Sequence, residues 1–300
     1  MANDLFSNSQ GRNLIFLFSQ PRAGSTMVQQ ILGGHPDIHT VSEPWIMLHP
    51  LLALRPDDIQ SEIDPNNYRV RQFKHFLSLI NAEDSEALYF EQVGKFCGSL
   101  YDAVRKTTRK KFFLDKTPRY YYIIPELYRT FPQAKFIILF RNPLAVLMSM
   151  LTTWAKGNVF WLSNSGRKHD LLSAPQLLVE GAKKLGGAGL VCHYEDIVSN
   201  PKEEVRKLTE FIGVEYSDSI VNYGDSNLPS WNFGDQNSVY SLQKPKKAKA
   251  QEWIGKINNY KTWRLVNDYL EFLSPEIIEK MGYSYSENKK ILLDHKTKYK

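Results

Sequence analysis

LIFLFSQPRAGSTMVQQIL, residues 14–32, is the stretch that decides the fold class. It starts as a short apolar run, continues as a polar turn with Pro21, Arg22 and Gly24, and then favours a helix that begins at Ser25. A strand, a turn and a helix in this order are typical of a phosphate-binding loop in an α/β protein. A Walker-type loop would carry a lysine after its last glycine to reach the outer phosphates, but Gly24 is followed directly by Ser25. The stretch therefore predicts an anion site that differs from a triphosphate loop, although such a turn can also be purely structural.

Three further runs have strand character, and segments with a helical pattern separate them. We expect a central, mostly parallel sheet flanked by helices, because strands that alternate with helices favour this α/β arrangement. Ligands of such sheets bind at the carboxyl ends of the strands. The further strands are expected at KFFLD (111–115), KFIILF (135–140) and GLVCHY (189–194), and helices over residues 25–33, 69–81, 86–108, 119–131, 143–156, 175–186, 200–212 and 262–272. Residues 157–173 and 222–248 read as long irregular segments, of the kind that form lids or binding loops.

Length and composition favour one domain. The 300 residues, 42% of them hydrophobic, are enough for a large core, and no repeat or interdomain linker divides them. We expect a single domain over residues 1–300, with a core at about 12–285 and a basic tail at 286–300. Cys97 and Cys192 lie in apolar surroundings without metal-ligand spacing, which predicts two reduced core thiols.

The chain shows neither a secretory pattern at its start nor an apolar run of the roughly 18 residues that cross a membrane. We therefore expect a cytoplasmic protein with no integral membrane association. Its formal net charge is +6, and the basic runs match no nucleic-acid-binding motif, so no nucleic acid partner is expected. Such runs are usually solvated surface, but a modest basic bias also suits an anionic ligand.

A second polar motif, RNPLAVLMSML, follows the strand at 135–140. Arg141 stands at the carboxyl end of this strand, Pro143 favours a helix start, and Ser149 follows eight residues after the arginine. The fixed fork of an arginine and the small hydroxyl of a serine suit a phosphate monoester. Alternatively, Arg141 caps a helix or pairs with a surface carboxylate.

Together the two motifs resemble those of the sulfotransferases that use 3′-phosphoadenosine 5′-phosphosulfate (PAPS). PRAGST resembles the 5′-phosphosulfate loop of that family, RNPLAVLMS resembles its 3′-phosphate motif, and they lie about 120 residues apart in the expected order. Weaker similarity extends from Leu14 to about Trp253. The bacterial, Golgi-carbohydrate and tyrosylprotein branches are more similar than the cytosolic steroid and phenol branch, which usually has lysine where Arg22 stands. The resemblance implies a P-loop-kinase-like fold, a PAPS donor and no required metal, so a missing Walker lysine is expected.

The resemblance also assigns a donor site. It implies that the 5′-phosphosulfate is held by the first motif and the 3′-phosphate by the second. Tyr194 and Glu195 match a family segment near the nucleotide. We expect their role to be structural in the first place and functional in the second. A late loop, DQNSVYSLQKP, resembles the family's loop over the donor. The implied donor-binding residues are Arg22, Ala23, Gly24, Ser25, Thr26, Arg141, Ser149, Tyr194, Ser238 and Lys244. One departure from the tyrosylprotein pattern is Glu252, where relatives place a lysine before the tryptophan; Lys247 and Lys249 are the candidate substitutes.

Sulfuryl transfer to a hydroxyl needs a base, in-line placement and positive charge near the leaving oxygen. Glu43 lies seven residues after Pro36, the spacing of the tyrosylprotein-like pattern, and is the predicted base. Alternatively, Glu43 caps the helix that follows Pro44. Arg22 is expected to supply positive charge, together with Lys116 in LDKTPRYYY, which resembles the lysine of an NKDP-like segment in the same branch. Alternatively, Lys116 pairs with Asp115 or another carboxylate on the surface. The competing bases are His35, His39 and His49.

The acceptor is expected to be a hydroxyl of a small molecule, glycan or lipid. Aromatic rings in the expected acceptor region could stack on a sugar, a phenol or an acyl chain, although each is also an ordinary core residue. These rings are Trp45, Trp154, Phe160 and Trp161. Two other functions are considered: a P-loop nucleotide kinase or NTPase, with Asp115 as its strand-ending acid, and a non-catalytic nucleotide-binding scaffold, in which Glu43 and Lys116 would point away from the loop.

Overall fold

The computed structural model describes residues 10–55, 68–80, 83–164, 167–225, 244–245, 252–296 and 298. A five-stranded parallel sheet forms the centre of this part, with the strand order β2-β3-β1-β4-β5. The central strand β1 pairs with β3 on one side and β4 on the other, so Phe16 is opposite both Asp115 and Phe136. The strands are β1 (Leu14–Ser19), β2 (Ile38–Ser42), β3 (Phe112–Lys116), β4 (Lys135–Phe140) and β5 (Gly189–His193).

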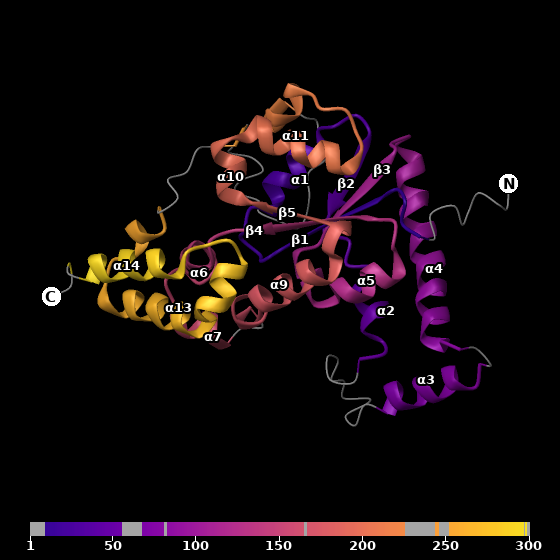
Figure 1. Cartoon of the computed structure of the whole chain (residues 1–300), viewed down its shortest axis with the longest axis horizontal. Coiled ribbons are helices and arrows are strands. Elements are labelled where there is room, and N and C mark those ends of the chain that lie inside the picture. The colour runs from indigo at the N-terminus through magenta and orange to yellow at the C-terminus, as the bar shows by residue number, and fades with distance from the viewer. Residues whose placement is uncertain are drawn as a thin grey trace.

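Helices cover both faces of the sheet (Figure 1). Side chains of β1 alternate between the two faces: Phe16 and Phe18 belong to one buried cluster, and Ile15 and Leu17 belong to the other. The Phe16 cluster is covered by α2 (Leu48–Leu52), α4 (Ser85–Thr107), α5 (Ile124–Thr130) and α9 (Ala174–Leu185). The Ile15 cluster is covered by α1 (Ser25–Gly33), α10 (Tyr194–Ser199) and α11 (Pro201–Ile212).

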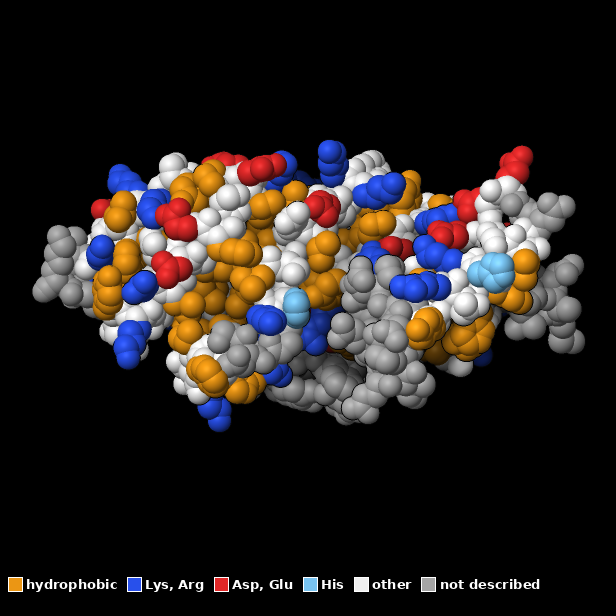
Figure 2. All heavy atoms as spheres, turned by 90° about the horizontal axis from the view of Figure 1, so that it is seen from below, with side chains coloured by type: hydrophobic (Ala, Val, Ile, Leu, Met, Phe, Trp, Pro, Cys, Tyr) orange, Lys and Arg blue, Asp and Glu red, His pale blue; other side chains and the backbone are white. Residues whose placement is uncertain are grey.

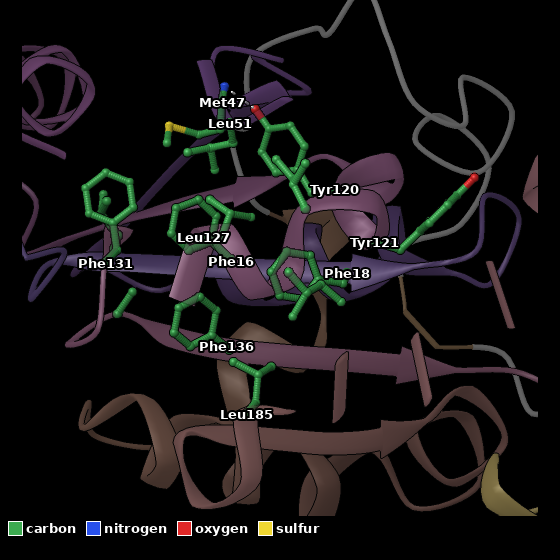
Figure 3. Packing of buried hydrophobic residues seen from close by; sticks show 14 of the residues in the cluster. Phe16, Phe18, Met47, Leu51, Tyr120, Tyr121, Leu127, Phe131, Phe136 and Leu185 are labelled. Atoms are coloured by element: carbon green, nitrogen blue, oxygen red, sulfur yellow. Dashed lines mark hydrogen bonds between the residues drawn. The ribbon is translucent and has the colours of Figure 1, made fainter. Parts of the chain in front are cut away.

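Aromatic side chains fill the first cluster. The ring centroid of Phe16 lies 5.8 Å from those of Phe131 and Phe136, and Figure 3 shows these rings with the other side chains of the cluster. The hydroxyl of Tyr120 accepts a hydrogen bond of 3.0 Å from the backbone N–H of Met47. This bond ties the segment after β2 to the segment after β3, and both segments reach the site described below.

A third cluster lies at one end of the elongated molecule, where α6 and the C-terminal helices gather (Figure 1). It contains Ala23 of the turn after β1, so this turn is buried against α6. The helices of this end are α6 (Pro143–Thr153), α7 (Val159–Asn164), α8 (Lys168–Leu172), α13 (Tyr260–Lys280) and α14 (Tyr285–Lys296).

Seen from below, the surface shows hydrophobic side chains between acidic and basic ones, and the basic side chains are spread over this face (Figure 2).

The fold class predicted from the sequence is confirmed, because the sheet is parallel and flanked by helices. The four predicted strands are present, but β2 was not predicted. β2 is a five-residue edge strand that pairs with β3 alone, and its polar His39 and Thr40 give no apolar run to find. Thr40 is nevertheless buried, and its hydroxyl is satisfied there because it donates to the Leu114 carbonyl at 2.8 Å.

Several predicted boundaries are wrong. The helix expected at 119–131 is a 3₁₀ turn at Pro118–Ile123 followed by α5, which begins just before Pro125. The irregular segment expected at 157–173 contains α7 and α8. The helix expected at 262–272 is the first part of α13, which continues to Lys280 through a kink at Ser274.

The expected basic tail at 286–300 is largely helical, since α14 extends to Lys296. Its buried residues explain the difference: Leu292 is buried, its carbonyl accepts a 2.8 Å hydrogen bond from the Trp263 indole, and His295 lies 3.1 Å from the Ile257 carbonyl. Of its lysines, Lys290 is exposed, whereas Lys289 donates to Asn267 of α13 at 2.9 Å. The single-domain assignment for residues 1–300 stays a prediction.

Two other expectations concern the core and membranes. Cys97 and Cys192 are buried and free, as predicted, and burial raises the pKa of the Cys97 thiol to about 11. Over the residues that the structure describes, none of the helices combines the length and apolar character needed to cross a bilayer.

Candidate functional site

A cleft of about 590 Å³ opens at the carboxyl ends of the central strands. Its walls include the turn after β1, Glu43 and Trp45 after β2, Lys116 and Arg119 at the end of β3, and Arg141 after β4. This is the edge at which parallel sheets bind their ligands. The sheet order therefore brings together residues that are far apart in the sequence.

The turn after β1 is built on two residues with positive φ, Arg22 at 70° and Gly24 at 101°. A Cβ atom on Gly24 would lie 2.5 Å from the Tyr194 ring, so this position admits glycine alone. Helix α1 begins at Ser25 without a side-chain cap, and Ser25 and Thr26 line the cleft. The first amides of a helix and its dipole attract an anion, and they open here into the cleft.

Ala23, predicted as a donor-binding residue, lies outside this lining. Its N–H donates to the Gln20 carbonyl at 3.1 Å, and its side chain is buried with those of α6. It shapes the turn rather than facing the cleft.

Arg22 and Arg141 line one side of the cleft, and the buried Ser149, which is not part of the lining, contacts Arg22 from behind it. The Arg22 Nε donates to Ser149 Oγ at 3.3 Å, and Arg141 Nη1 donates to the Arg22 carbonyl at 2.9 Å. The Arg141 guanidinium also lies over the Tyr194 ring, 4.3 Å from its centroid. Its buried Nε has no hydrogen-bond partner among the described residues. A buried donor without a partner at a cleft wall fits a site for an anionic oxygen.

Glu195 fixes the start of the loop that carries Arg141. Its carboxylate accepts hydrogen bonds from the Asn142 N–H at 3.1 Å and from the Tyr283 hydroxyl at 2.6 Å. The Asn142 side chain also donates to Asn288 Oδ1 at 3.0 Å. Glu195 thus has the structural position that was expected for it. Tyr283 and Asn288 were not predicted, because no motif marks contacts made across so many residues.

Glu43 and Lys116 face each other across the cleft wall, with Lys116 Nζ 2.9 Å from Glu43 Oε1. The Lys116 side chain is 1% exposed and that of Glu43 is 15% exposed. Both residues line the cleft that contains the turn after β1. Glu43 is therefore paired with a buried ammonium group rather than capping the helix after Pro44.

Asp115 points elsewhere. Its carboxylate accepts hydrogen bonds from the hydroxyls of Tyr101 and Thr117, at 2.5 and 2.7 Å, and it does not line the cleft. Burial raises the pKa of Asp115 to about 6. Its position differs from that of the metal-holding acid that a nucleotide kinase would place beside the phosphates.

The three candidate histidine bases also lie outside the lining of the cleft. His35 is buried, with Nε2 2.9 Å from the Glu215 carbonyl and Nδ1 accepting from the Asp37 N–H. The ring of His39 lies against Phe113, and burial followed by the charge of Lys110 lowers its pKa. Glu43 is the candidate base that the cleft contains.

Two of the four aromatic residues expected in the acceptor region line the cleft, Trp45 and Trp154. Trp45 has a φ of 59°, which is strained for a bulky residue and is typical of functional sites. Trp161 lies at the rim, where the Arg167 guanidinium stacks 4.5 Å from its ring centroid. Phe160 is 76% exposed and does not line the cleft, which corrects the expectation for this residue.

Most of the late loop, and most of the irregular segment expected at 222–248, lies outside the described residues. Ser238, Lys247 and Lys249 lie outside the described residues. Lys244 is exposed and is not part of the lining.

The described lining is strongly basic. It contains one acid, Glu43, and two cations that the sequence did not suggest as site residues, Arg119 and Arg167. Arg119 stands three residues after Lys116, just beyond the end of β3, and this place in the sequence could have marked it as a site residue. No motif surrounds Arg167. Such an excess of positive charge favours an anionic ligand and stabilises charge that develops in a reaction. The lining cations are Arg22, Lys116, Arg119, Arg141 and Arg167.

Comparisons with known proteins show which family this chain resembles. A family model described as the sulfotransferase family matches residues 14–218. Nodulation protein NoeE from Sinorhizobium fredii is 31% identical over 258 residues, which are 75% of this chain and 59% of that protein. Protein-tyrosine sulfotransferase A from Caenorhabditis elegans is 25% identical over 211 residues, 70% of this chain and 52% of that protein. The chain thus spans little more than half the length of these two relatives.

A solved structure shares the fold. The sulfotransferase domain from the Synechococcus PCC 7002 olefin synthase superposes with a TM-score of 0.51 at 22% identity. The match covers 85% of this chain and 94% of that domain.

Proposed function

Because the chain belongs to the sulfotransferase family, we propose that it transfers the sulfuryl group of PAPS to a hydroxyl group of an acceptor by in-line attack. The observation that carries the proposal is the Glu43–Lys116 ion pair, which lies in the same cleft as a phosphate-type loop without a Walker lysine. A kinase would need that lysine, whereas sulfuryl transfer needs a base and positive charge at this place.

The donor would occupy the basic side of the cleft. Arg141, with its unpartnered Nε, and Ser149 would bind the 3′-phosphate. Arg22 and the first turn of α1, at Ser25 and Thr26, would bind the 5′-phosphosulfate. Tyr194 would support Arg141 through its ring.

The Glu43 carboxylate would accept the proton of the acceptor hydroxyl while that oxygen attacks the sulfur. The bond between sulfur and the bridging oxygen breaks, so the products are a sulfate ester and 3′-phosphoadenosine 5′-phosphate (PAP), with the proton left on Glu43. Lys116 and Arg22 would stabilise the negative charge that develops on the departing phosphate. Lys116 is placed to act on both partners, because it already contacts the base.

The two alternative functions are not favoured. The nucleotide kinase or NTPase would need Asp115 at the phosphates, but its carboxylate is bonded to Tyr101 and Thr117 in the core. The non-catalytic scaffold would be favoured by Glu43 and Lys116 turned away from the loop after β1, but both residues line the cleft with it. The acceptor remains proposed at the level of a hydroxyl on a small molecule, glycan or lipid.

The donor assignment is tested by thermal unfolding with PAP and, separately, with ATP and magnesium. At about 100 times its dissociation constant a ligand stabilises the folded state by about 2.7 kcal/mol. We expect PAP to raise the melting temperature of the wild type and to lose this effect in Arg141→Ala. The matched control is Arg206→Ala, which removes an exposed arginine that stacks on Tyr216 away from the cleft. Stabilisation by ATP with magnesium but not by PAP would overturn the proposal.

A further inference from the structure

Arg167 lines the cleft, and its guanidinium lies over two indole rings. Its guanidinium is 5.1 Å from the ring centroid of Trp154 and 4.5 Å from that of Trp161. Trp154 in turn lies 5.9 Å from the Arg22 guanidinium. A row of alternating cations and rings therefore runs from the turn after β1 to Trp161, which is 37% exposed.

The other lining cations already have polar partners. Lys116 pairs with Glu43, and Arg119 donates to both carboxylate oxygens of the buried Asp170, at 3.0 and 2.7 Å. Within the described part of the chain, Arg167 has stacking partners but no carboxylate within ion-pair distance. Stacking occupies the faces of a guanidinium and leaves its N–H edge, with five donors, available for a ligand.

A second cleft, of about 430 Å³, adjoins the first and shares Trp45, Arg119 and Arg167 with it. Its other described walls include Leu48, Tyr122 and His169. Glu43 stands two residues before Trp45. An acceptor with its hydroxyl at Glu43 would therefore extend past Trp45 into this second cleft, and its body would pass Arg167.

We propose that the acceptor carries an anionic group and that Arg167 binds it at the junction of the two clefts. This inference rests on the proposed function and adds a substrate class to it. Arg167 is the described lining cation with neither a protein carboxylate nor an assigned donor group to neutralise it. Its indole partners hold the guanidinium in place, so less conformational freedom is lost when the anion binds.

Binding of two phenols of nearly equal shape tests the proposal. 4-Hydroxyphenylacetate carries a carboxylate, and 4-hydroxyphenylacetamide replaces it with a neutral amide. Each is titrated by calorimetry into the wild type, Arg167→Gln and Arg206→Gln, with and without saturating PAP. The exposed Arg206 stacks on Tyr216 at 4.7 Å and is a matched arginine outside the cleft.

We expect the wild type and Arg206→Gln to bind the carboxylate about 10- to 100-fold more tightly than the amide, the range for a hydrogen bond to a charged group. In Arg167→Gln this ratio should fall to near one, while PAP affinity stays unchanged. The inference is overturned if the wild type binds the two probes equally or binds neither. It is also overturned if Arg167→Gln keeps the wild-type ratio of carboxylate affinity to amide affinity. A large loss of PAP affinity in Arg167→Gln would instead assign the residue to the donor. Failure of PAP to bind the wild type, with the probe ratio intact, would overturn the proposed function and leave the anion site standing.

Discussion

Glu43 and Lys116 form an ion pair of unequal exposure, and the lysine is the more buried partner. Removing the Glu43 charge therefore leaves a buried ammonium group without its counter-charge, which costs stability as well as activity. A catalytic effect at this pair must be separated from a folding effect.

For Glu43→Gln we expect turnover to fall by roughly two to four orders of magnitude, the usual effect of a lost general base. PAP affinity should be largely kept. The measurement is transfer of radiolabelled sulfate from PAPS to the acceptor that the wild type uses best, at a temperature well below the melting point of the variant. Glu91→Gln, which breaks the exposed ion pair with Lys95 on α4, is the control and should keep full turnover. Turnover near the wild-type rate in Glu43→Gln would remove Glu43 from the mechanism.

Gly24 gives a second prediction at the residue scale. Gly24→Ala should lower PAP affinity at least tenfold, because the added Cβ would lie 2.5 Å from Tyr194 and displace the ring that supports Arg141. Gly213→Ala is the matched control: its φ is also positive, at 88°, but no atom lies within 4 Å of the added Cβ. The control should lose about 1 kcal/mol of stability and keep its PAP affinity, measured by calorimetry. Equal PAP affinity in the two variants would contradict the close packing of this turn.

At the residue scale, the sequence indicated the residues that belong to contiguous motifs. Glu43, Lys116, Arg22 and Arg141 could be found because each stands beside a strand or a recognisable spacing. Arg167 could not, because its position depends on stacking against Trp154 and Trp161 and no local pattern requires it.

At the scale of elements, the C-terminal helices support the segment that carries Arg141. Tyr283, between α13 and α14, donates to Glu195, and Asn288 of α14 accepts from Asn142. The matched family region ends at residue 218, so these contacts come from a part of the chain beyond it. Residues of α14 and of the turn between α13 and α14 therefore hold in place the segment of Arg141 and Asn142 before α6.

Tyr283→Phe should weaken PAP binding about 3- to 10-fold, since it removes a hydrogen bond to a carboxylate that positions the loop before α6. Tyr285→Phe is the control, because its hydroxyl donates to the exposed Glu271 at 2.7 Å in the same region. Calorimetric titration of PAP into both variants makes the comparison. A loss of affinity that is the same in the two variants would mean that the effect is general destabilisation.

The elements that were not predicted share one property: their secondary structure depends on tertiary contacts. β2 is short and polar, and it is a strand because β3 pairs with it. α14 lies in the stretch that was predicted as a basic tail, and it is a packed helix because Leu292 and His295 are buried against α13 and the segment before it. The strands β1, β3, β4 and β5 were predictable because a strand buried on both faces gives a continuous apolar run.

At the scale of the whole molecule, a buried carboxyl group makes stability depend on pH. Burial raises the pKa of Asp115 to about 6 in the folded protein, above its ordinary value of about 3.9. The folded state then binds the proton more tightly than the unfolded state. The stabilisation from this group is present below pH 4 and is lost as the pH rises through 6.

When the pH rises from 4.5 to 7.5, the unfolding free energy of the wild type should therefore fall by about 2 kcal/mol more than that of Asp115→Asn, because the asparagine amide does not titrate. Urea unfolding of both proteins at the two pH values measures the difference, and the subtraction removes the contribution of groups that they share. A constant difference between the two proteins would show that Asp115 keeps an ordinary pKa.

The strand order also places the two proposed sides of the cleft on different strands. β1 lies at the centre of the sheet, and its turn lines the cleft on the proposed donor side, whereas β2 is an edge strand that pairs with β3 alone. The proposed acceptor side comes from the segment after this edge strand and from the short surface helices around Arg167. Substitutions on this side leave β1 and its turn unchanged, so the proposed acceptor side can vary separately from the proposed donor side. A directed-evolution library limited to these peripheral segments should redirect substrate choice while leaving the energetics of the central sheet intact.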